Sequence, residues 1–469
     1  MYIVSQNKSP AGYFKSIVYN SIAFIEYNKT FKLLVKLSCP SIIVNILFYI
    51  LHWCYEYSYK FYEKGKFIEI ISINSSIELI LILLALEGIS DSTKTLLCIA
   101  IGSKKNQVIA NSFYAGMIMN VGYIIIISPI LLYISKFLLF FGYKKNLAED
   151  LQYLMNFQIL HYVFSAINQN LFVYVRSFLV IFPAHLIDLI CSILLLIFGF
   201  ISLFIFHLEL LGFAISFIFF HLIRFVLIIL YIKKNKLHLF LYEGSIKGTF
   251  LKIKELLRLS IPASIDYTCE VLVSECLALY LVKLGKEELV AHFGVQTVYD
   301  FCINFPYGLG ISLQTLVGNY FGKKNIAKLI QLKKAAIILV VSLSISCSII
   351  AVMLRSIFFT YVIKMKESEE IFSKAILIGI IGFSVNCYIY IQCYFLVGLT
   401  MQLESTISSF VGKTMINLII GIILLKFTNL GVIGLWIASL IGFSTSLVIN
   451  HWTISKIDYS KLFEKIKID

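Results

Sequence analysis

The sequence predicts an all-α polytopic membrane protein with twelve transmembrane helices in two six-helix lobes related by pseudo-two-fold symmetry. Three observations support this fold class. Hydrophobic residues make up 59% of the 469 residues and charged residues only 14%, whereas soluble domains are about half apolar and a quarter charged. Apolar runs of bilayer length, which takes roughly 20 residues, recur along the chain. Two stretches of the first half also reappear in the second half at a nearly constant spacing.

The apolar runs define the predicted elements in order. We expect spans at residues 33–57, 68–101, 108–135, 152–180, 183–206, 209–232, 256–283, 289–320, 331–362, 371–399, 405–427 and 431–455. A basic, more polar segment separates the first six from the last six. The predicted organisation is a cytoplasmic N-terminal tail (1–32), an N-lobe (33–232), a cytoplasmic linker (233–255), a C-lobe (256–455) and a cytoplasmic C-terminal tail (456–469).

The net charge of +14 follows the predicted topology. Lysines concentrate before the first span, between the sixth and seventh, after the eighth and after the last, while the intervening loops balance bases with acids. The positive-inside rule predicts this alternation for an even number of spans with both ends in the cytoplasm. We therefore expect a lipid bilayer partner and no nucleic acid. The plasma membrane is the default location, with an organelle membrane as the alternative.

The two halves of the chain resemble each other. "VKLSCP", which ends at Pro40, matches "LRLSIP", which ends at Pro262, an offset of 222 residues (262 − 40). Farther along, Gly88 matches Gly308 within a longer similar stretch, an offset of 220 (308 − 88). An internal duplication of a six-helix unit explains both. Two copies inserted in the same orientation are related by an axis along the membrane normal and leave a cleft between them, as in some secondary transporters.

One of these stretches, "PYGLGISLQTLVGNYFGKKN", resembles a segment typical of multidrug and toxin extrusion (MATE) transporters. The shared pattern consists of Pro306, a run of small residues, Val317-Gly318-Asn319 and then Gly322. The resemblance implies export of organic cations, driven by protons or sodium, through rocking of two lobes.

The seventh span strengthens the resemblance. Eukaryotic MATE members place two glutamates five residues apart, eight residues after an Ile-Pro, and here these are Glu270 and Glu275 after Pro262. The chain also departs from the family. A glutamate often found on the tenth span is Asn386 here, and a position that is often glutamate on the eighth span is Thr297, three residues before Asp300.

Charged residues inside a membrane span are costly and mark functional sites by default. Asp266 and Glu270 are four residues apart and share a helix face, so both can face a cleft, where a carboxylate binds either a proton or a cationic compound. A structural role, paired with a lysine such as Lys413, is the alternative. The candidate substrate- or ion-binding residues are Glu270, Glu275, Asp300, Asp266, Asn45, Asn386 and Glu78. The candidate structural-motif residues are Pro40, Pro262, Pro306, Gly308, Gly318, Asn319 and Gly322.

These patterns predict a transporter and not an enzyme. The "GKT" at 412–414 lacks the first glycine of a phosphate-binding loop, and we expect no metal and no cofactor, with a proton or sodium gradient as the energy source. The predicted function is secondary-active antiport of small organic, cationic substrates. One alternative is a lipid-linked glycan flippase, which needs a cationic cleft; Arg176 and Arg355 are the only arginines we expect to contribute to one. The other is a non-transporting relative.

Overall fold

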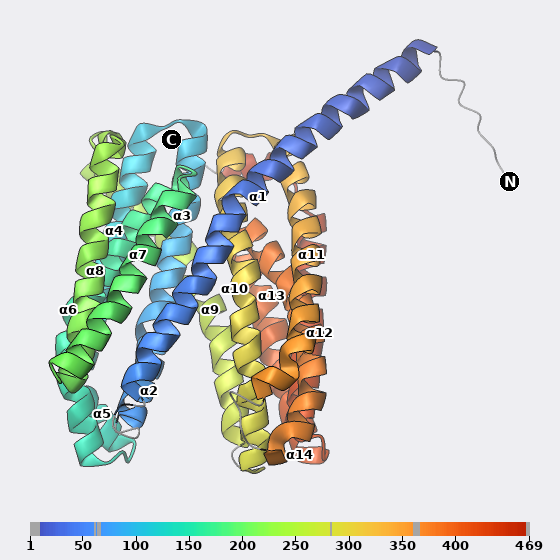
Figure 1. Cartoon of the computed structure of the whole chain (residues 1–469). Helices are drawn as coiled ribbons and strands as arrows, with labels where there is room; N and C mark the ends of the chain where they lie inside the picture. The colour runs from blue at the N-terminus through green and yellow to red at the C-terminus, as the bar shows by residue number, and fades with distance from the viewer. Residues whose placement is uncertain (1–9, 61, 63–66, 282–283, 360–365, 466–469) are drawn as a thin grey trace.

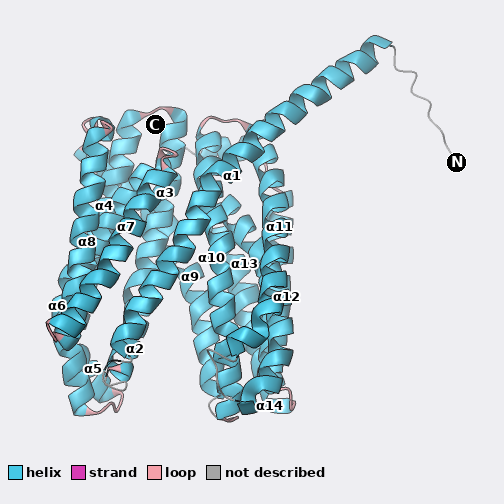
Figure 2. Ribbon diagram, viewed as in Figure 1, coloured by secondary structure: helices cyan, strands magenta, loops and turns pink. Residues whose placement is uncertain are grey.

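A computed structural model describes residues 10–60, 62, 67–281, 284–359 and 366–465. All regular secondary structure in these ranges is helical (Figure 2). The first half comprises α1 (Pro10–Lys60), α2 (Ile68–Glu78), η2 (Leu79–Leu83), α3 (Leu84–Ser103), α4 (Asn106–Leu132), α5 (Ile134–Phe140), α6 (Lys145–Ser177), α7 (Ile181–Phe200), η3 (Ile201–Ile205) and α8 (Glu209–Lys234).

The second half repeats this order of long helices. After η4 (Leu237–Leu241) it comprises α9 (Ile246–Leu281), α10 (Lys286–Gly322), α11 (Ile326–Phe358), η6 (Lys366–Ser368), α12 (Glu369–Gly398), α13 (Gln402–Ser409), η7 (Phe410–Ile416), α14 (Asn417–Phe427), α15 (Gly431–Ser455) and α16 (Tyr459–Lys465). The π-helical segments η2, η3 and η7 continue directly into their neighbours, so each of these groups forms one long helical element.

Each of the twelve predicted spans falls on one of these long helices. Among the described residues, nine helical segments are long and apolar enough to cross a membrane on length and composition alone. The other three predicted spans lie on α6, α9 and α10, which have 33, 36 and 37 residues. Of these, α6 and α10 carry more polar side chains, many of them buried within the bundle, such as Gln158, Asn168 and Gln314. A hydropathy window therefore underrates α6 and α10, while several side chains of α9 lie outside the described residues.

The helices form two bundles that stand side by side, with α1 running obliquely between them (Figure 1). The serine Ser41 on α1 lies at this junction. Its hydroxyl is 3.0 Å from Nε2 of His185 on α7 and 3.5 Å from the hydroxyl of Ser312 on α10. The helix also begins at Pro10, so much of the segment predicted as an N-terminal tail is helical.

Contacts between the two bundles repeat with the spacing of the duplication. A Cβ added at Gly88 on α3 would meet Ser264 on α9, and one added at Gly308 on α10 would meet Ile42 on α1. The two partners are 222 residues apart (264 − 42), and the two glycines 220.

A second pair of contacts repeats in the same way nearer the C-terminal ends of α3 and α10. Gly102 abuts the backbone of Asn319, while Gly322 abuts the backbone of Ile99, again with both members offset by 220 residues (322 − 102 and 319 − 99). Gly318 packs against Cys98, its own counterpart in the repeat, so the pseudo-two-fold axis passes close to this contact. Such reciprocal contacts are what a two-fold interface produces, and they confirm the predicted symmetry.

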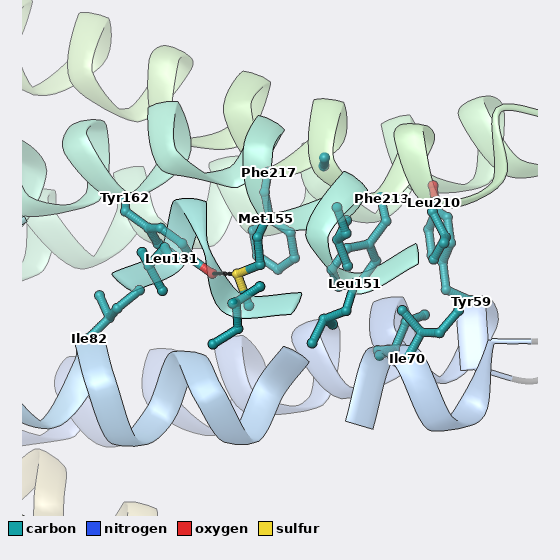
Figure 3. Packing of buried hydrophobic residues seen from close by; sticks show 14 of the residues in the cluster. Tyr59, Ile70, Ile82, Leu131, Leu151, Met155, Tyr162, Leu210, Phe213 and Phe217 are labelled. Carbon is teal, nitrogen blue, oxygen red and sulfur yellow. Dashed lines mark hydrogen bonds between the residues drawn. The ribbon is translucent and has the colours of Figure 1, made fainter. Parts of the chain in front are cut away.

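Each bundle has its own apolar core. In the first, buried tyrosines combine large apolar rings with satisfied hydroxyls: Tyr55 donates to the carbonyl of Phe213 at 2.8 Å, and the hydroxyls of Tyr59 and Ser202 are 2.5 Å apart. Figure 3 shows how residues of this core from α1, α2, α6 and α8 interdigitate. The second bundle has a comparable core that includes Leu277 and Trp436. The polar cavities described below therefore lie within bundles held together by their own packing.

Candidate transport site

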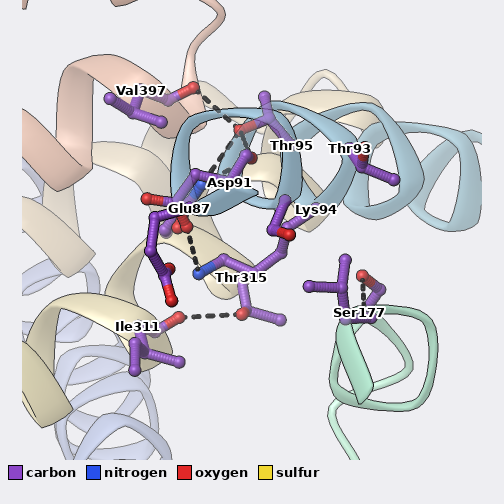
Figure 4. A network of polar contacts seen from close by, with 12 residues as sticks. Glu87, Asp91, Thr93, Lys94, Thr95, Ser177, Ile311, Thr315 and Val397 are labelled. Atoms are coloured by element: carbon purple, nitrogen blue, oxygen red, sulfur yellow. Dashed lines mark hydrogen bonds and ion pairs between the residues drawn. The ribbon is translucent and has the colours of Figure 1, made fainter. Parts of the chain in front are cut away.

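A polar junction joins the two lobes at the middle of α3. The carboxylate of Asp91 lies 3.2 Å from the ammonium of Lys94, one turn along the same helix (Figure 4). It also accepts a hydrogen bond from the hydroxyl of Tyr267 on α9. The lysine side chain is 4% exposed and the aspartate side chain 13%. An ion pair this deeply buried needs hydrogen bonds to offset its desolvation, and Tyr267 supplies one of them from the opposite lobe.

The helix backbone around this pair is held from the C-lobe as well. The amide nitrogen of Gln314 on α10 donates to the carbonyl of Asp91 and to the hydroxyl of Thr95, both at 3.0 Å. That hydroxyl also donates to the carbonyl of Val397 on α12 at 3.1 Å. Three C-lobe helices thus fix the position of Asp91 through Tyr267, Gln314 and Val397.

A cavity of about 310 Å³ lies within the first lobe, beside this junction. Glu78 of α2 lines it, and its carboxylate is 3.9 Å from Nε2 of His161. Glu87 lines it too and accepts a hydrogen bond from Gln169 at 3.4 Å. We call this space the N-lobe cavity; its charged or titratable lining also includes His52, Asp91, Lys94, Arg176, His221 and Arg224.

Two arginines of the N-lobe cavity are held by one carboxylate. Asp188 on α7 is 2.5 Å from a terminal nitrogen of Arg176 and 2.7 Å from Nε of Arg224. The side chain of Asp188 is 6% exposed. Arg224 corrects the expectation that Arg176 and Arg355 are the only arginines able to contribute to a cationic cleft, because it lies on α8 and lines the cavity. Since Asp188 pairs with both, their positive charge is partly neutralised.

A larger cavity of about 480 Å³ is lined mainly by the second lobe, with Leu79 and Leu84 of the first lobe on one side. Asp300 on α10 contributes a carboxylate, whose Oδ1 accepts a hydrogen bond from the side-chain amide of Gln296 at 2.8 Å. Most of the remaining lining is aromatic or apolar. We call this space the C-lobe cavity; its aromatic lining residues are Tyr267, His292, Phe293, Tyr299, Tyr390, Trp436 and Phe443.

The rings of the C-lobe cavity pack into a continuous wall. The centroid of Tyr299 is 5.9 Å from that of Trp436 and 6.4 Å from that of Phe443. Asn386 on α12 is fully buried and donates its side-chain amide to the hydroxyl of Tyr299. Asn386 therefore fixes the orientation of an aromatic ring beside Asp300. A volume of this size, mostly apolar with a few placed polar groups, is typical of sites for small organic ligands.

A third, narrow space lies where the lobes meet. This inter-lobe cleft measures about 50 Å³ and is lined by Asp91 from the N-lobe and by Asp266, Tyr267, Tyr390, Tyr394 and Lys413 from the C-lobe. The hydroxyl of Ser405 donates to the carboxylate of Asp266 at 3.2 Å. The cleft shares Asp91 with the N-lobe cavity and shares Tyr267, Tyr390 and Lys413 with the C-lobe cavity.

The structure thus distributes the predicted site residues over three spaces. Asp300 lines the C-lobe cavity, Asp266 the inter-lobe cleft and Glu78 the N-lobe cavity. Asn386 is hydrogen-bonded to Tyr299, which lines the C-lobe cavity. Asn45 lies half-buried on α1, and its side-chain nitrogen has no hydrogen-bond partner in the part of the chain that the structure describes. The side chains of Glu270 and Glu275 lie outside the described residues.

The predicted structural-motif residues lie inside long helices or at the lobe junction. Gly308, Gly318, Asn319 and Gly322 make the close inter-lobe contacts described above. Pro40, Pro262 and Pro306 lie within α1, α9 and α10. The carbonyl of Pro262 accepts a hydrogen bond from the hydroxyl of Thr406 at 2.8 Å, which ties α9 to α13.

Sequence reasoning missed the polar junction. Asp91 and Lys94 stand in the repeated stretch that begins at Gly88, and an acid and a base three residues apart share a helix face. That spacing inside an apolar span was the available signal. Tyr267 carried no comparable signal, because the chain contains 28 tyrosines and spacing alone does not distinguish one of them.

Known proteins share this fold. Residues 262–423 match the MatE family model. A eukaryotic MATE transporter, AtDTX14, superposes with a TM-score of 0.84 at 18% identity, covering 94% of this chain and 98% of that one. The Vibrio cholerae MATE transporter VcmN in its bent form superposes with a TM-score of 0.81 at 15% identity, covering 94% of this chain and 98% of that one.

A third similar structure is an outward-facing multidrug resistance MATE family transporter of the MOP superfamily, with a TM-score of 0.83 at 15% identity over 92% of this chain and 96% of that one. Among curated protein sequences, none matches this chain. The matching residues 262–423 and the two-lobe architecture agree with the resemblance read from the sequence. The chain is thus an integral multi-pass membrane protein that carries a MatE domain within the MATE transporter fold.

Proposed function

We propose that this protein is a secondary-active exporter of small organic cations, which exchanges them for protons or sodium by alternating access. The observation that supports the proposal most is the C-lobe cavity, where a carboxylate lies among aromatic side chains inside a two-lobe membrane protein. Its volume of about 480 Å³ falls within the usual range for drug-sized ligands.

The C-lobe cavity is lined by one carboxylate, Asp300, and one ammonium, Lys413, and its aromatic faces favour a cation over an anion. The carboxylate of Asp300 attracts positive charge, and the faces of Tyr299, Trp436 and Phe443 attract a cation through their ring quadrupoles. Such rings also bury the apolar parts of an organic molecule. A small inorganic cation would gain little from these apolar walls, so the lining favours an organic one.

Exchange follows if the coupling ion and the substrate compete for one carboxylate. Asp300 shares the cavity with the proposed substrate, so a proton or sodium ion bound there removes the charge that holds the organic cation. The substrate is then released on the side to which the lobes have opened. The N-lobe cavity holds further carboxylates, Glu78 and Glu87, that can take up the same ion.

The geometry offers less support for a lipid-linked glycan flippase. Such a protein needs free positive charge for a pyrophosphate group. The cationic side chains of the N-lobe cavity are engaged instead: Arg176 and Arg224 contact Asp188, and Lys94 contacts Asp91. A non-transporting relative is distinguished from an exporter by measured transport.

The test is efflux of a fluorescent organic cation from liposomes that contain the purified protein, first with an imposed pH gradient and then with a sodium gradient. We expect one gradient to drive efflux and Asp300→Asn to reduce its rate at least about ten-fold, since a contact to a charged group contributes about 1.5 kcal/mol or more. The matched control is Glu370→Gln, which removes an acid that is 80% exposed at the start of α12.

The outcomes separate the three candidate functions. Efflux driven by either gradient and lost only in Asp300→Asn supports the exporter and identifies its ion. Equal efflux in Asp300→Asn and wild type contradicts the assignment of the C-lobe cavity. Folded protein that moves the cation with neither gradient contradicts the exporter, and a lipid flipping assay then distinguishes a flippase from a non-transporting relative.

A further inference from the structure

The inter-lobe cleft is lined by three tyrosines, and two buried lysines lie against their rings. The ammonium of Lys413 lies 4.8 Å from the ring centroid of Tyr390, and that of Lys94 lies 5.9 Å from the centroid of Tyr394. Lys413 is 5% exposed and Lys94 3%. Both distances are within reach of a cation–π interaction, which is stronger when the cation is desolvated.

The position of Lys413 is fixed by the helix that carries it. Lys413 lies in η7, a π-helical segment, and such segments occur frequently at functional sites. A Cβ added at Gly412 would lie 2.6 Å from the carbonyl oxygen of Gly442, so the backbone of η7 touches α15 on that side. The hydroxyl of Ser408 donates to the carbonyl of Ser446 at 3.0 Å, and that of Ser446 donates to the carbonyl of Ser408 at 2.7 Å.

With η7 held against α15 by these contacts, the Lys413 side chain lies between two spaces. It lines both the inter-lobe cleft, with Asp266, and the C-lobe cavity, with Tyr390 and Asn417. The cleft of about 50 Å³ has room for water but not for an organic cation. An organic cation too large for the cleft can approach Tyr390 from the C-lobe cavity, which Tyr390 and Lys413 both line, and the Lys413 ammonium already lies over that ring.

We infer that Lys413 is a tethered competitor of the transported cation: its ammonium occupies the Tyr390 ring when the site is empty, and the substrate's cationic group displaces it. This inference rests on the proposed function and names a specificity determinant within the same cavity. The ligand class is an organic cation whose charge is exposed to an aromatic face, as in a quaternary ammonium or phosphonium. Lys413 therefore sets a minimum affinity for the transported cation, because a weakly binding cation does not displace the lysine from the ring.

Binding of tetramethylammonium to the purified full-length protein tests the inference. Lys413→Met keeps the length of the side chain and removes the competing charge, so we expect a Kd about ten-fold lower than that of wild type, the size of a desolvated cation–π contact. Lys413→Gln is a second neutral variant in case Met does not fold at this position. The matched control is Lys426→Met, because Lys426 also lies over a ring, 5.4 Å from the centroid of Phe427, but is exposed.

A double-mutant cycle separates competition for the ring from a general change of charge. In a Tyr390→Leu background, Lys413→Met should no longer lower the Kd. In a Tyr390→Phe background, which keeps the ring, it should still lower the Kd. If Lys413→Met still lowers the Kd in the Tyr390→Leu background, competition for Tyr390 is overturned. The inference is also overturned if both neutral variants have an unchanged or higher Kd while wild type still binds and transports the cation. If wild type and the neutral variants neither bind nor transport any cation, the proposed function itself fails.

Discussion

At the scale of single residues, Asp91 connects the two lobes directly. It holds Lys94 within its own helix and Tyr267 across the junction. It also lies in the wall shared by the inter-lobe cleft and the N-lobe cavity. Any movement that separates α3 from α9 must break its bond to Tyr267, so the buried carboxylate loses one hydrogen bond and keeps its ion pair with Lys94 on the same helix.

Tyr267→Phe tests this contact without changing the size of the ring. A hydrogen bond to a charged group contributes about 1.5–3 kcal/mol, so we expect a lower midpoint of thermal unfolding in detergent. The control is Tyr153→Phe, because Tyr153 is 47% exposed. An unfolding midpoint equal to that of the control would show that the Asp91–Tyr267 contact does not stabilise the closed junction.

The residue scale also shows where sequence reasoning is weakest. Asp300 could be identified because an acid in an apolar span is rare. Nothing in the sequence states that it faces the same cavity as Trp436, which is more than a hundred residues away along the chain. Asp266 and Asp300 stand on neighbouring spans and look equivalent in the sequence, yet they line different spaces. That assignment depends on the rotation of each helix, which apolar spans hydrophobic on all sides do not specify.

At the scale of helices, the long elements follow directly from the sequence, because a bilayer requires continuous hydrogen-bonded helices. Each predicted span lies on a long helix, and the contacts of Gly88 with Ser264 and of Gly308 with Ile42 are related by the symmetry that the duplication predicts. The π-helical turns could not be predicted. They depend on how one helix packs against its neighbour, as η7 does against α15.

Close contact between α3 and α10 should control which side of the protein opens. In Gly322→Ala, the added Cβ would lie 2.9 Å from the carbonyl carbon of Ile99. Relief of this overlap requires the ends of α3 and α10 to move apart, and overpacking of this kind typically costs about 1–3 kcal/mol. We therefore expect the variant to favour a state that is open at the C-terminal ends of these helices.

The distance between spin labels at positions 105 and 324, in a background with exposed Cys39 and Cys276 replaced by serine, measures this opening. We expect the distribution to shift to longer distances in Gly322→Ala. Gly122→Ala is the control, because nothing lies within 4 Å of a Cβ added there. Identical distributions in Gly322→Ala and in the control would contradict a gating role for this contact.

At the scale of the whole molecule, the two lobes have similar architecture but different chemistry. The N-lobe cavity is lined by opposing charges in a close pair, Asp91 with Lys94. The C-lobe cavity has an aromatic wall and the carboxylate of Asp300. Under the proposed function, this asymmetry favours the C-lobe cavity for the organic substrate and the N-lobe carboxylates Glu78 and Glu87 as additional ion sites. Duplication explains the common fold, while the divergence of the cavities could not be read from the repeated stretches, which lie at the lobe junction.

The central claim is that an organic cation and a proton or sodium ion are exchanged one for the other. The most direct measurement loads liposomes containing the protein with tetraphenylphosphonium, imposes no ion gradient, and records luminal pH and sodium as the cation leaves. Exchange predicts that outflow of the cation drives protons or sodium inward, although neither ion has a gradient of its own. Asp300→Asn should remove both movements. Outflow without any counter-movement of either ion would contradict it.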